Sequence, residues 1–406
     1  MAVATSSKRF LPSVSRPYPV LALISSAHGV THMYAALLPL IYPMMIVQFH
    51  ISISELGLVL GISSALGGIL QFVFGVAGRY VPHRVLIGLG NVFCGLSVGL
   101  MGFMSSFLQF TGLRLLLQTA NSPQHPIGNS MIASRFSPAK RGSALSIHVA
   151  GGNLGTILVP IVGTFLISRF GWQPTMVVFG IPGLIVGAAI TMTVAEGKEH
   201  LQHEVRQGRV SADIWSFFRN RTIVLITLSS VAAAGGRGLG VLLTYLPLYL
   251  KNGLHLDNTL VGALFTVLLV GSVVGPVMGG RASDLLGRKR AILIALAASF
   301  VFTFGIVAST SNVVPLAAAL ILMGLAVYGQ GPMMQTYLAD VAPPENRDTT
   351  FGVYFAITFG AGAAWTAAMG AVIDRFGFTV AFLAIAASYV LTFLLQLPAE
   401  EYRLAA

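Results

Sequence analysis

Charged residues are scarce in this chain. Asp, Glu, Lys and Arg make up only 9% of its 406 residues, whereas soluble proteins carry about 25%. Hydrophobic residues account for 55%, and the mean hydropathy is +0.81. This composition excludes an ordinary water-soluble protein and predicts a polytopic membrane protein.

Acids and cysteines are rarer still. The chain has 13 Asp and Glu against 24 Lys and Arg, and Cys94 is its only cysteine. A disulfide within the chain is therefore excluded. The sequence shows no nucleotide-binding loop, no spacing typical of a metal site and no nucleophile–base–acid set. We expect a protein that is not an enzyme and that has no bound cofactor or metal.

Twelve apolar segments are long enough, at about 20 residues each, to cross a bilayer. With the N-terminus in the cytoplasm, 19 Lys and Arg fall on the cytoplasmic side and 3 on the outer side. This bias predicts a multi-pass protein of a bacterial-type inner membrane with both termini cytoplasmic. It also accounts for the net charge of +11 without a nucleic-acid partner. The predicted spans are 19–47, 55–78, 85–104, 107–133, 142–167, 174–195, 222–250, 258–282, 291–309, 312–339, 349–373 and 378–397.

An internal repeat divides the chain into two halves. The triplet Arg-Phe-Gly at 169–171 recurs 206 residues later, at 375–377. At the same shift Gln124 coincides with Gln330. The fold class predicted is all-α, with twelve transmembrane helices in two pseudo-symmetric six-helix bundles and a substrate site between them.

The predicted boundaries follow from the longest polar stretch. Residues 1–195 form the N-terminal bundle and residues 222–406 the C-terminal bundle. Residues 196–221 are a cytoplasmic linker that ends in an interfacial helix, with Trp215, Phe217 and Phe218 expected to face lipid.

A loop motif in the second half carries a family resemblance. The segment 280–290 reads GRASDLLGRKR, and it resembles the G-x-x-x-D-x-x-G-R-[KR] loop of the major facilitator superfamily. The segment 155–164, GTILVPIVGT, is similar to that superfamily's antiporter motif. The resemblance implies a gating role for Gly280, Asp284, Gly287 and Arg288. It implies close helix packing at Gly155, Pro160 and Gly163.

Within the superfamily, the first half most resembles the fosmidomycin-resistance family. The resemblance rests on His28 with Met33, on Tyr42-Pro43, on His125-Pro126 and on the segment 146–160. Two departures stand out. His32 lies where that family tends to have an acid, and Ile127 lies where it tends to have Glu.

The resemblance implies that spans one, four, seven and ten line a central cavity. These spans carry basic and amide side chains and no acid in their middle. Such a wall suits an anion, because the arginine guanidinium binds carboxylate or phosphonate oxygens bidentately. The candidate substrate-binding or coupling residues are His28, His32, Arg114, Gln124, His125, Arg237, Gln330 and Gln335.

Two histidines on one helix face are the predicted proton carriers. His28 and His32 lie four residues apart, and therefore on the same side of a helix. Histidine titrates near neutral pH, so either ring can load and release a proton. The alternative is a structural role, in which each ring donates to a carbonyl of a neighbouring helix.

These observations predict a secondary active transporter that works by alternating access. We expect it to export a small anionic organic compound, driven by protons, as a drug-resistance antiporter and as a monomer. The first alternative is uptake or exchange of an organic anion, and a non-transporting membrane receptor is a further alternative.

Overall fold

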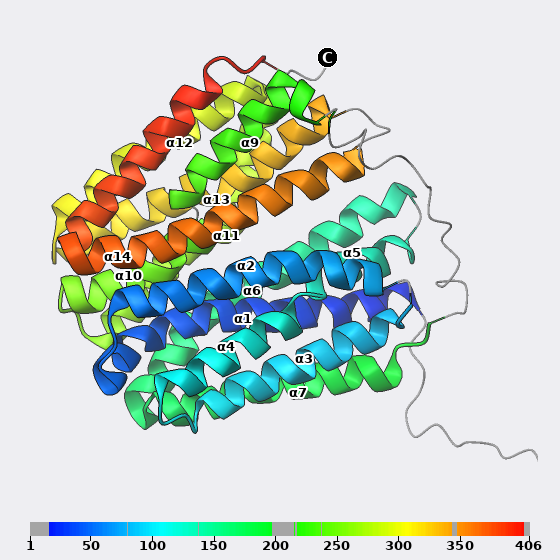
Figure 1. Ribbon diagram of the computed structural model, residues 1–406, viewed down its shortest axis with the longest axis horizontal. Helices are drawn as coiled ribbons and strands as arrows, with labels where there is room; N and C mark the ends of the chain where they lie inside the picture. The colour runs from blue at the N-terminus through cyan, green and yellow to red at the C-terminus, as the bar shows by residue number, and fades with distance from the viewer. Residues whose placement is uncertain are drawn as a thin grey trace, which may run out of the picture.

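The computed structural model is built from helices (Figure 1). It describes residues 16–78, 80–136, 138–196, 215, 217–236, 238–342 and 347–401. The elements are α1 (Pro17–Phe49), α2 (Ile53–Ala77), α3 (His83–Met101), α4 (Phe107–Asn121), α5 (Gln124–Ala133), α6 (Pro138–Phe170), α7 (Trp172–Thr193), α9 (Arg221–Ala233), the 3₁₀-helix η2 (Ala234–Gly236), the π-helix η3 (Gly238–Leu242), α10 (Leu243–Leu248), the π-helix η4 (Tyr249–Gly253), α11 (Asn258–Leu286), α12 (Arg288–Ser309), α13 (Val313–Val341) and α14 (Arg347–Gln396).

The helices match the predicted membrane spans. Ten helical segments of the described chain are long and apolar enough to cross a membrane. The last of them, Thr350–Gln396, contains two predicted spans. The predicted span 107–133 is divided between α4 and α5. The all-α fold class is therefore confirmed.

A break in the fourth span separates α4 from α5. Pro123 lies between the two helices, and proline has no N–H with which to continue the helical hydrogen bonds. The Ser122 hydroxyl donates to the Gln118 carbonyl at 2.7 Å and so stabilises the end of α4. The break places Gln124 and His125 in the first turn of α5.

The repeated Arg-Phe-Gly triplet ends a helix segment in both halves. Gly171 has φ of 86°, and Gly377 has φ of 81°. Positive φ is costly for residues with a Cβ and is freely available to glycine. Gly171 separates α6 from α7, and Gly377 interrupts the helical backbone within α14. The sequence repeat is thus a repeat of backbone geometry.

Small residues bring helix axes close together inside the N-terminal bundle. A Cβ placed on Gly95 of α3 would lie 2.6 Å from the carbonyl oxygen of Gly180 on α7. A Cβ on Gly29 of α1 would lie 2.9 Å from the carbonyl oxygen of Gly151 on α6. In the apolar environment of a membrane such close approach supplies van der Waals packing that larger side chains prevent.

One expectation about the linker is wrong. Trp215 and Phe218 are exposed, as the interfacial helix requires, but Phe217 is buried in the hydrophobic core. Neighbouring residues on a helix point in different directions, so three aromatic side chains within four positions cannot all face lipid. Residues 197–214 of the predicted linker lie outside the described residues.

The two bundles meet along α2 and α14 and also along α6 and α11. In Figure 1 the N-terminal bundle (blue to green) lies below the C-terminal bundle (green to red). A Cβ on Gly61 of α2 would lie 2.8 Å from the carbonyl oxygen of Ala363 and 2.9 Å from the Cβ of Ala367, both on α14. A Cβ on Gly57 would lie 3.2 Å from the Cα of Gly370. A Cβ on Gly57 would also lie 2.5 Å from the hydroxyl of Tyr245 on α10, so glycine lets both backbone and side chains of the C-terminal bundle come close to α2.

A carboxylate of α14 forms hydrogen bonds with α2 at one end of the α2–α14 contact. Asp374 of α14 accepts hydrogen bonds from the backbone N–H groups of Ile53, at 3.1 Å, and Ser54, at 2.5 Å. These groups lie at the N-terminus of α2, where the helix dipole favours a negative charge. At the other end of α2, a Cβ on Gly75 would meet only Pro126 of the same bundle. The bundles are thus joined at the end where α2 begins.

The first prediction concerns this backbone contact. Gly61→Ala adds a methyl group where backbone atoms leave no room, and overpacking of this kind costs about 1–3 kcal/mol. We expect the thermal unfolding midpoint of the detergent-purified protein to fall.

Gly360→Ala on α14 is the matched control, because a Cβ there meets no atom within 4 Å. We expect its midpoint to stay level or to rise, since alanine favours helix over glycine. Equal midpoints for the two variants would show that the α2–α14 contact is loose.

Candidate substrate-binding site

A cavity of about 160 Å³ lies where the two bundles meet. A cavity of about 150 Å³ is large enough to hold benzene, so this one has room for a small organic molecule. Its wall is formed by α1, α2, α3 and α4 of the N-terminal bundle and by η3, α10 and α14 of the C-terminal bundle. None of the described residues of the wall is acidic. Its polar members are Thr31, Tyr34, Tyr42, Ser64, Arg114, Gln118, Asn121, Thr244 and Thr366.

Arg114 is the charged member of this wall among the residues that the structure describes. Its Nε atom is buried and has no hydrogen-bond partner among the described residues, and the same holds for Oδ1 of Asn121. The ion pairs of the described chain involve Arg288 and Arg290 and lie elsewhere. An unpaired buried donor on a cationic group is costly to leave unsatisfied. The cavity therefore offers an anion a guanidinium with free donor capacity.

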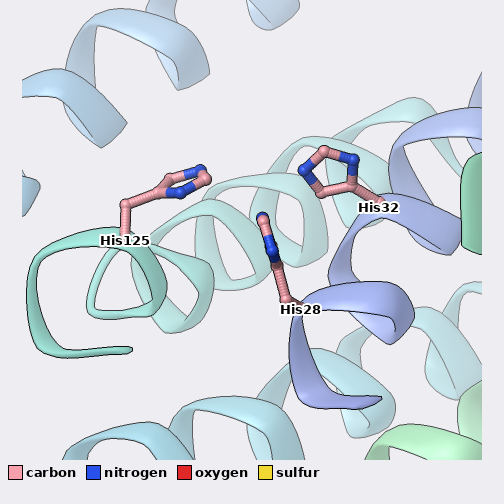
Figure 2. A group of neighbouring side chains, drawn as sticks. All are labelled: His28, His32 and His125. Carbon is pink, nitrogen blue, oxygen red and sulfur yellow. The ribbon is translucent and has the colours of Figure 1, made fainter. Parts of the chain in front are cut away.

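Four histidines gather in the N-terminal bundle beside the cavity. The ring centroids of His28 and His32 on α1 are 4.5 Å apart, and His125 on α5 lies 5.2 Å from His28. His148 on α6 stacks on His28 at 4.3 Å. Figure 2 shows the rings of His28, His32 and His125 pointing toward one another. Thr31, next to His32 in the chain, belongs to the cavity wall, so the cluster adjoins the cavity.

Hydrogen bonds orient the two rings on α1. Nδ1 of His28 lies 3.0 Å from the backbone carbonyl oxygen of His148, to which it donates as an N–H. Nδ1 of His32 lies 3.2 Å from the hydroxyl oxygen of Thr156 on α6. The first bond is the contact that a structural histidine makes. It leaves Nε2 of His28 buried and without a partner among the described residues.

The glutamines lie inside the bundles. Gln124 is buried, and its Oε1 accepts from Nδ2 of Asn91 on α3 at 3.3 Å. Gln330 is buried at the equivalent place in the other half, and its Nε2 donates to the Ser299 hydroxyl on α12 at 2.8 Å. Neither side chain belongs to the cavity wall. The repeated glutamine thus joins neighbouring helices within its own bundle.

Other candidate residues fall into three groups. Arg237 lies outside the described residues. Gln335 is half-buried on α13 and is not part of the cavity wall. Gly155, Pro160 and Gly163 lie on α6, where Gly155 touches the carbonyl group of Gly29 on α1 and a Cβ on Gly163 would lie 3.2 Å from Cδ1 of Leu37.

The family model described as "Major Facilitator Superfamily" matches residues 24–257 and 238–403. These ranges cover nearly the whole chain. The protein belongs to the Major Facilitator Superfamily. Members of this superfamily are transporters and not enzymes, so the chain is a membrane transporter. Its composition predicts a multi-pass membrane protein, and the loop motif predicts the superfamily.

Curated relatives of the superfamily extend over most of the chain. The "Uncharacterized MFS-type transporter YfnC" of Bacillus subtilis is 24% identical over 99% of this chain and 98% of its own length. The "Fosmidomycin resistance protein" of Escherichia coli is 23% identical over 88% of this chain and 87% of its own. The "Hexuronate transporter" of Bacillus subtilis is 25% identical over 90% of each chain. The resemblance to the fosmidomycin-resistance family is thereby confirmed.

A solved superfamily structure shares the fold. The crystal structure of a mutant of the nucleoside transporter NupG superimposes with a TM-score of 0.78 at 13% identity, covering 93% of this chain and 98% of that chain. At this identity the likeness concerns the fold alone.

The superfamily loop motif is organised around Arg288. Gly287 has φ of 95° and turns the chain from α11 into α12. Nη1 of the buried Arg288 donates to Asp284 at 2.5 Å, and its Nε donates to Asp340 of α13 at 2.7 Å. The motif therefore locks α11, α12 and α13 together at one end of the C-terminal bundle. Gly280 lies in open surroundings, since a Cβ there meets no atom within 4 Å.

Asp340 is a residue that the sequence analysis missed. It lies 52 positions after Arg288, so no local spacing connects the two. Its side chain is 19% exposed, whereas that of Asp284 is 58% exposed. The less exposed carboxylate is the stronger partner, because water screens it less.

The second prediction separates the two carboxylates. Asp340→Asn removes the more buried partner of Arg288, and loss of one partner of a buried pair costs about 3–5 kcal/mol. We expect a marked fall in thermal unfolding midpoint. Asp284→Asn changes an exposed partner, so we expect stability to change little. If the loop has the gating role that the resemblance implies, transport turnover slows, because a conformational step is affected.

Glu401→Gln is the control for this pair of variants. Glu401 faces Arg290 at 3.8 Å, a looser ion pair whose arginine is exposed, and we expect both stability and turnover to be unchanged. A larger loss of stability in Asp284→Asn than in Asp340→Asn would show that Asp284 is the stronger partner of Arg288.

Proposed function

We propose that this transporter moves a small organic anion across a bacterial inner membrane by alternating access, as a proton-linked exporter. The observation that carries the proposal is Arg114, a guanidinium with a buried, unpaired Nε in a cavity wall that has no acid. A cationic substrate would find no counter-charge there. An anion would pair with Arg114 and accept hydrogen bonds from the amide and hydroxyl groups beside it.

The names of two relatives support an anionic substrate. One relative is a hexuronate transporter, and a hexuronate carries a carboxylate. Another is a fosmidomycin resistance protein, and fosmidomycin carries a phosphonate. Both groups present the planar or tripodal oxygen arrangement that a guanidinium recognises.

The contact between the bundles supports alternating access. Asp374 and the glycines of α2 hold the bundles together at the end where α2 begins. With both termini in the cytoplasm, as the distribution of Lys and Arg predicts, this end faces outward. The described arrangement is then closed to the outside, and transport requires the α2–α14 contact to open while the cytoplasmic ends approach each other.

This fold permits both export and uptake of an anion. The fosmidomycin resistance relative favours export, and the hexuronate relative favours uptake. The purified protein, reconstituted into liposomes, distinguishes them. Radiolabelled glucuronate and fosmidomycin are the probes, and a pH gradient of each sign is imposed. In proton-linked export the anion moves in the direction opposite to the proton flow. In proton-linked uptake the anion and the protons move in the same direction.

The proposal fails if neither probe, nor any compound from a panel of organic anions, moves faster than in protein-free liposomes. If the rate of anion transport does not depend on the pH gradient, the proposed anion site is supported and the proposed proton coupling is wrong. The assignment of His28 and His32 as proton carriers stays a prediction.

The third prediction tests the anion site. Arg114→Gln removes the positive charge while keeping amide donors, and truncating one partner of a buried charged pair costs about 2–5 kcal/mol. We expect the KM for the transported anion to rise by at least an order of magnitude. Arg114→Lys keeps the charge but loses the bidentate geometry, and we expect an intermediate KM.

Arg169→Gln is the matched control. Arg169 is exposed in the last turn of α6, away from the cavity wall, and we expect a wild-type KM. A wild-type KM in Arg114→Gln as well would contradict the anion site.

A further inference from the structure

We propose that His28, His32 and His125 form a binding site for one divalent transition-metal ion of the Zn²⁺ type. The three side chains each offer a ring nitrogen, and these nitrogens all lie within 4.8 Å of one another. In Figure 2 the ring of His28 points between those of His32 and His125. The proposal goes beyond anion transport and does not depend on it.

The distances suit a site that closes slightly around an ion. Zinc–imidazole bonds are about 2.0–2.1 Å long, so ligand nitrogens of a tetrahedral site lie about 3.4 Å apart. The three ligand nitrogens lie within 4.8 Å of one another, so binding an ion requires them to move closer together. Two of the ligands, His28 and His32, come from adjacent turns of α1, and the third comes from the first turn of α5.

The hydrogen bonds present the correct atoms to a metal. Metal-binding histidines commonly donate their other ring N–H to a carbonyl or another acceptor, which fixes the tautomer. Nδ1 of His28 has such an acceptor in the His148 carbonyl at 3.0 Å. Its Nε2 then carries a lone pair, and this atom is buried without a partner among the described residues.

His32 has the same arrangement. The Thr156 hydroxyl lies 3.4 Å from the Gly152 carbonyl oxygen, to which it donates. The hydroxyl oxygen is then free to accept from Nδ1–H of His32 at 3.2 Å. Nε2 of His32 is left as the ligand atom. Two of the three rings are therefore held in the tautomer that a metal requires.

Packing also limits how His28 can move. The ring lies against Gly152, where an added Cβ would be 2.9 Å from its Cε1 atom. On its other side the ring of His148 stacks at an interplanar angle of 23°. A ring confined in this way loses little further freedom on binding, which favours affinity.

The donor set selects the class of ion. Imidazole nitrogen suits zinc, copper, nickel and cobalt, whereas calcium and magnesium require oxygen ligands. The cluster contains no carboxylate. Three histidines leave the fourth position of a tetrahedral ion open, as in zinc sites that bind water or a substrate.

The fourth prediction uses metal alone, without any transport substrate. The full chain is purified without a polyhistidine tag, treated with EDTA and titrated with Zn²⁺ by calorimetry. We expect one Zn²⁺ per chain and no binding of Mg²⁺. We expect at least tenfold weaker binding in His28→Gln, His32→Gln and His125→Gln. Thr156→Val keeps the side-chain shape and removes the acceptor, and loss of such an outer partner weakens binding about 10–100-fold.

Two histidines outside the cluster provide controls. His50 and His255 have positive φ of 51° and 58° at helix ends, a conformation that asparagine also tolerates. We expect His50→Asn and His255→Asn to bind Zn²⁺ like the wild type. Unchanged affinity in the triple variant His28→Gln/His32→Gln/His125→Gln would overturn the proposal, as would the absence of saturable binding in the wild type.

A measurement on the wild-type protein avoids the risk that variants misfold. X-ray absorption at the zinc edge counts the ligands of the bound ion. We expect three imidazole nitrogens at about 2.0–2.1 Å. One imidazole or none would overturn the assignment. Because no organic anion is present, a negative result here leaves the anion-transport proposal untouched, and failed anion transport leaves the metal site untouched.

Discussion

The high free energy of a charge in a lipid bilayer determines where this chain can place its charged residues. A charged side chain at the bilayer centre costs about 2.5–3.5 kcal/mol on insertion scales, and the chain places few charges there. Arg114 is a charged residue within a predicted span, and it faces a cavity. With no acid in the wall, its charge is left for a ligand to neutralise. The same cost keeps most Lys and Arg in the loops, where the positive-inside bias gives the proposed orientation.

The histidine cluster and the cavity are neighbouring sites on one bundle. Thr31 contributes to the cavity wall, while His28 and His32 face the cluster from the same helix. Any ion held by the three rings would add positive charge to the bundle whose side of the cavity wall contains Arg114. A bound anion would reduce that charge, so the two ligands should favour each other's binding. By linkage this coupling is reciprocal: the anion would raise metal affinity by the same factor.

The sequence predicts the fold well and the site in part. Hydropathy, the positive-inside bias and the repeated triplet suffice for the helices and the two bundles, because the bilayer leaves little choice of secondary structure. Arg114 and the three histidines were identifiable as polar residues in apolar segments. Gln124 and Gln330 were assigned to the cavity on the same ground, yet each bonds a neighbouring helix. The direction in which a side chain points from its helix depends on packing, which the sequence does not show. The ion pair between Arg288 and Asp340 joins residues 52 positions apart, so no local spacing predicts it.

The glycine-lined contact between α2 and α14 has a kinetic consequence. Interlocked side chains must be withdrawn from one another before two surfaces part, which adds an activation barrier. Here Gly57 and Gly61 face Gly370, Ala363 and Ala367, and the Tyr245 hydroxyl also reaches Gly57. Small residues at most of these positions reduce the interlocking that must be undone before the faces separate. The hydrogen bonds of Asp374 at the end of α2 are directional contacts that must break when these two faces separate.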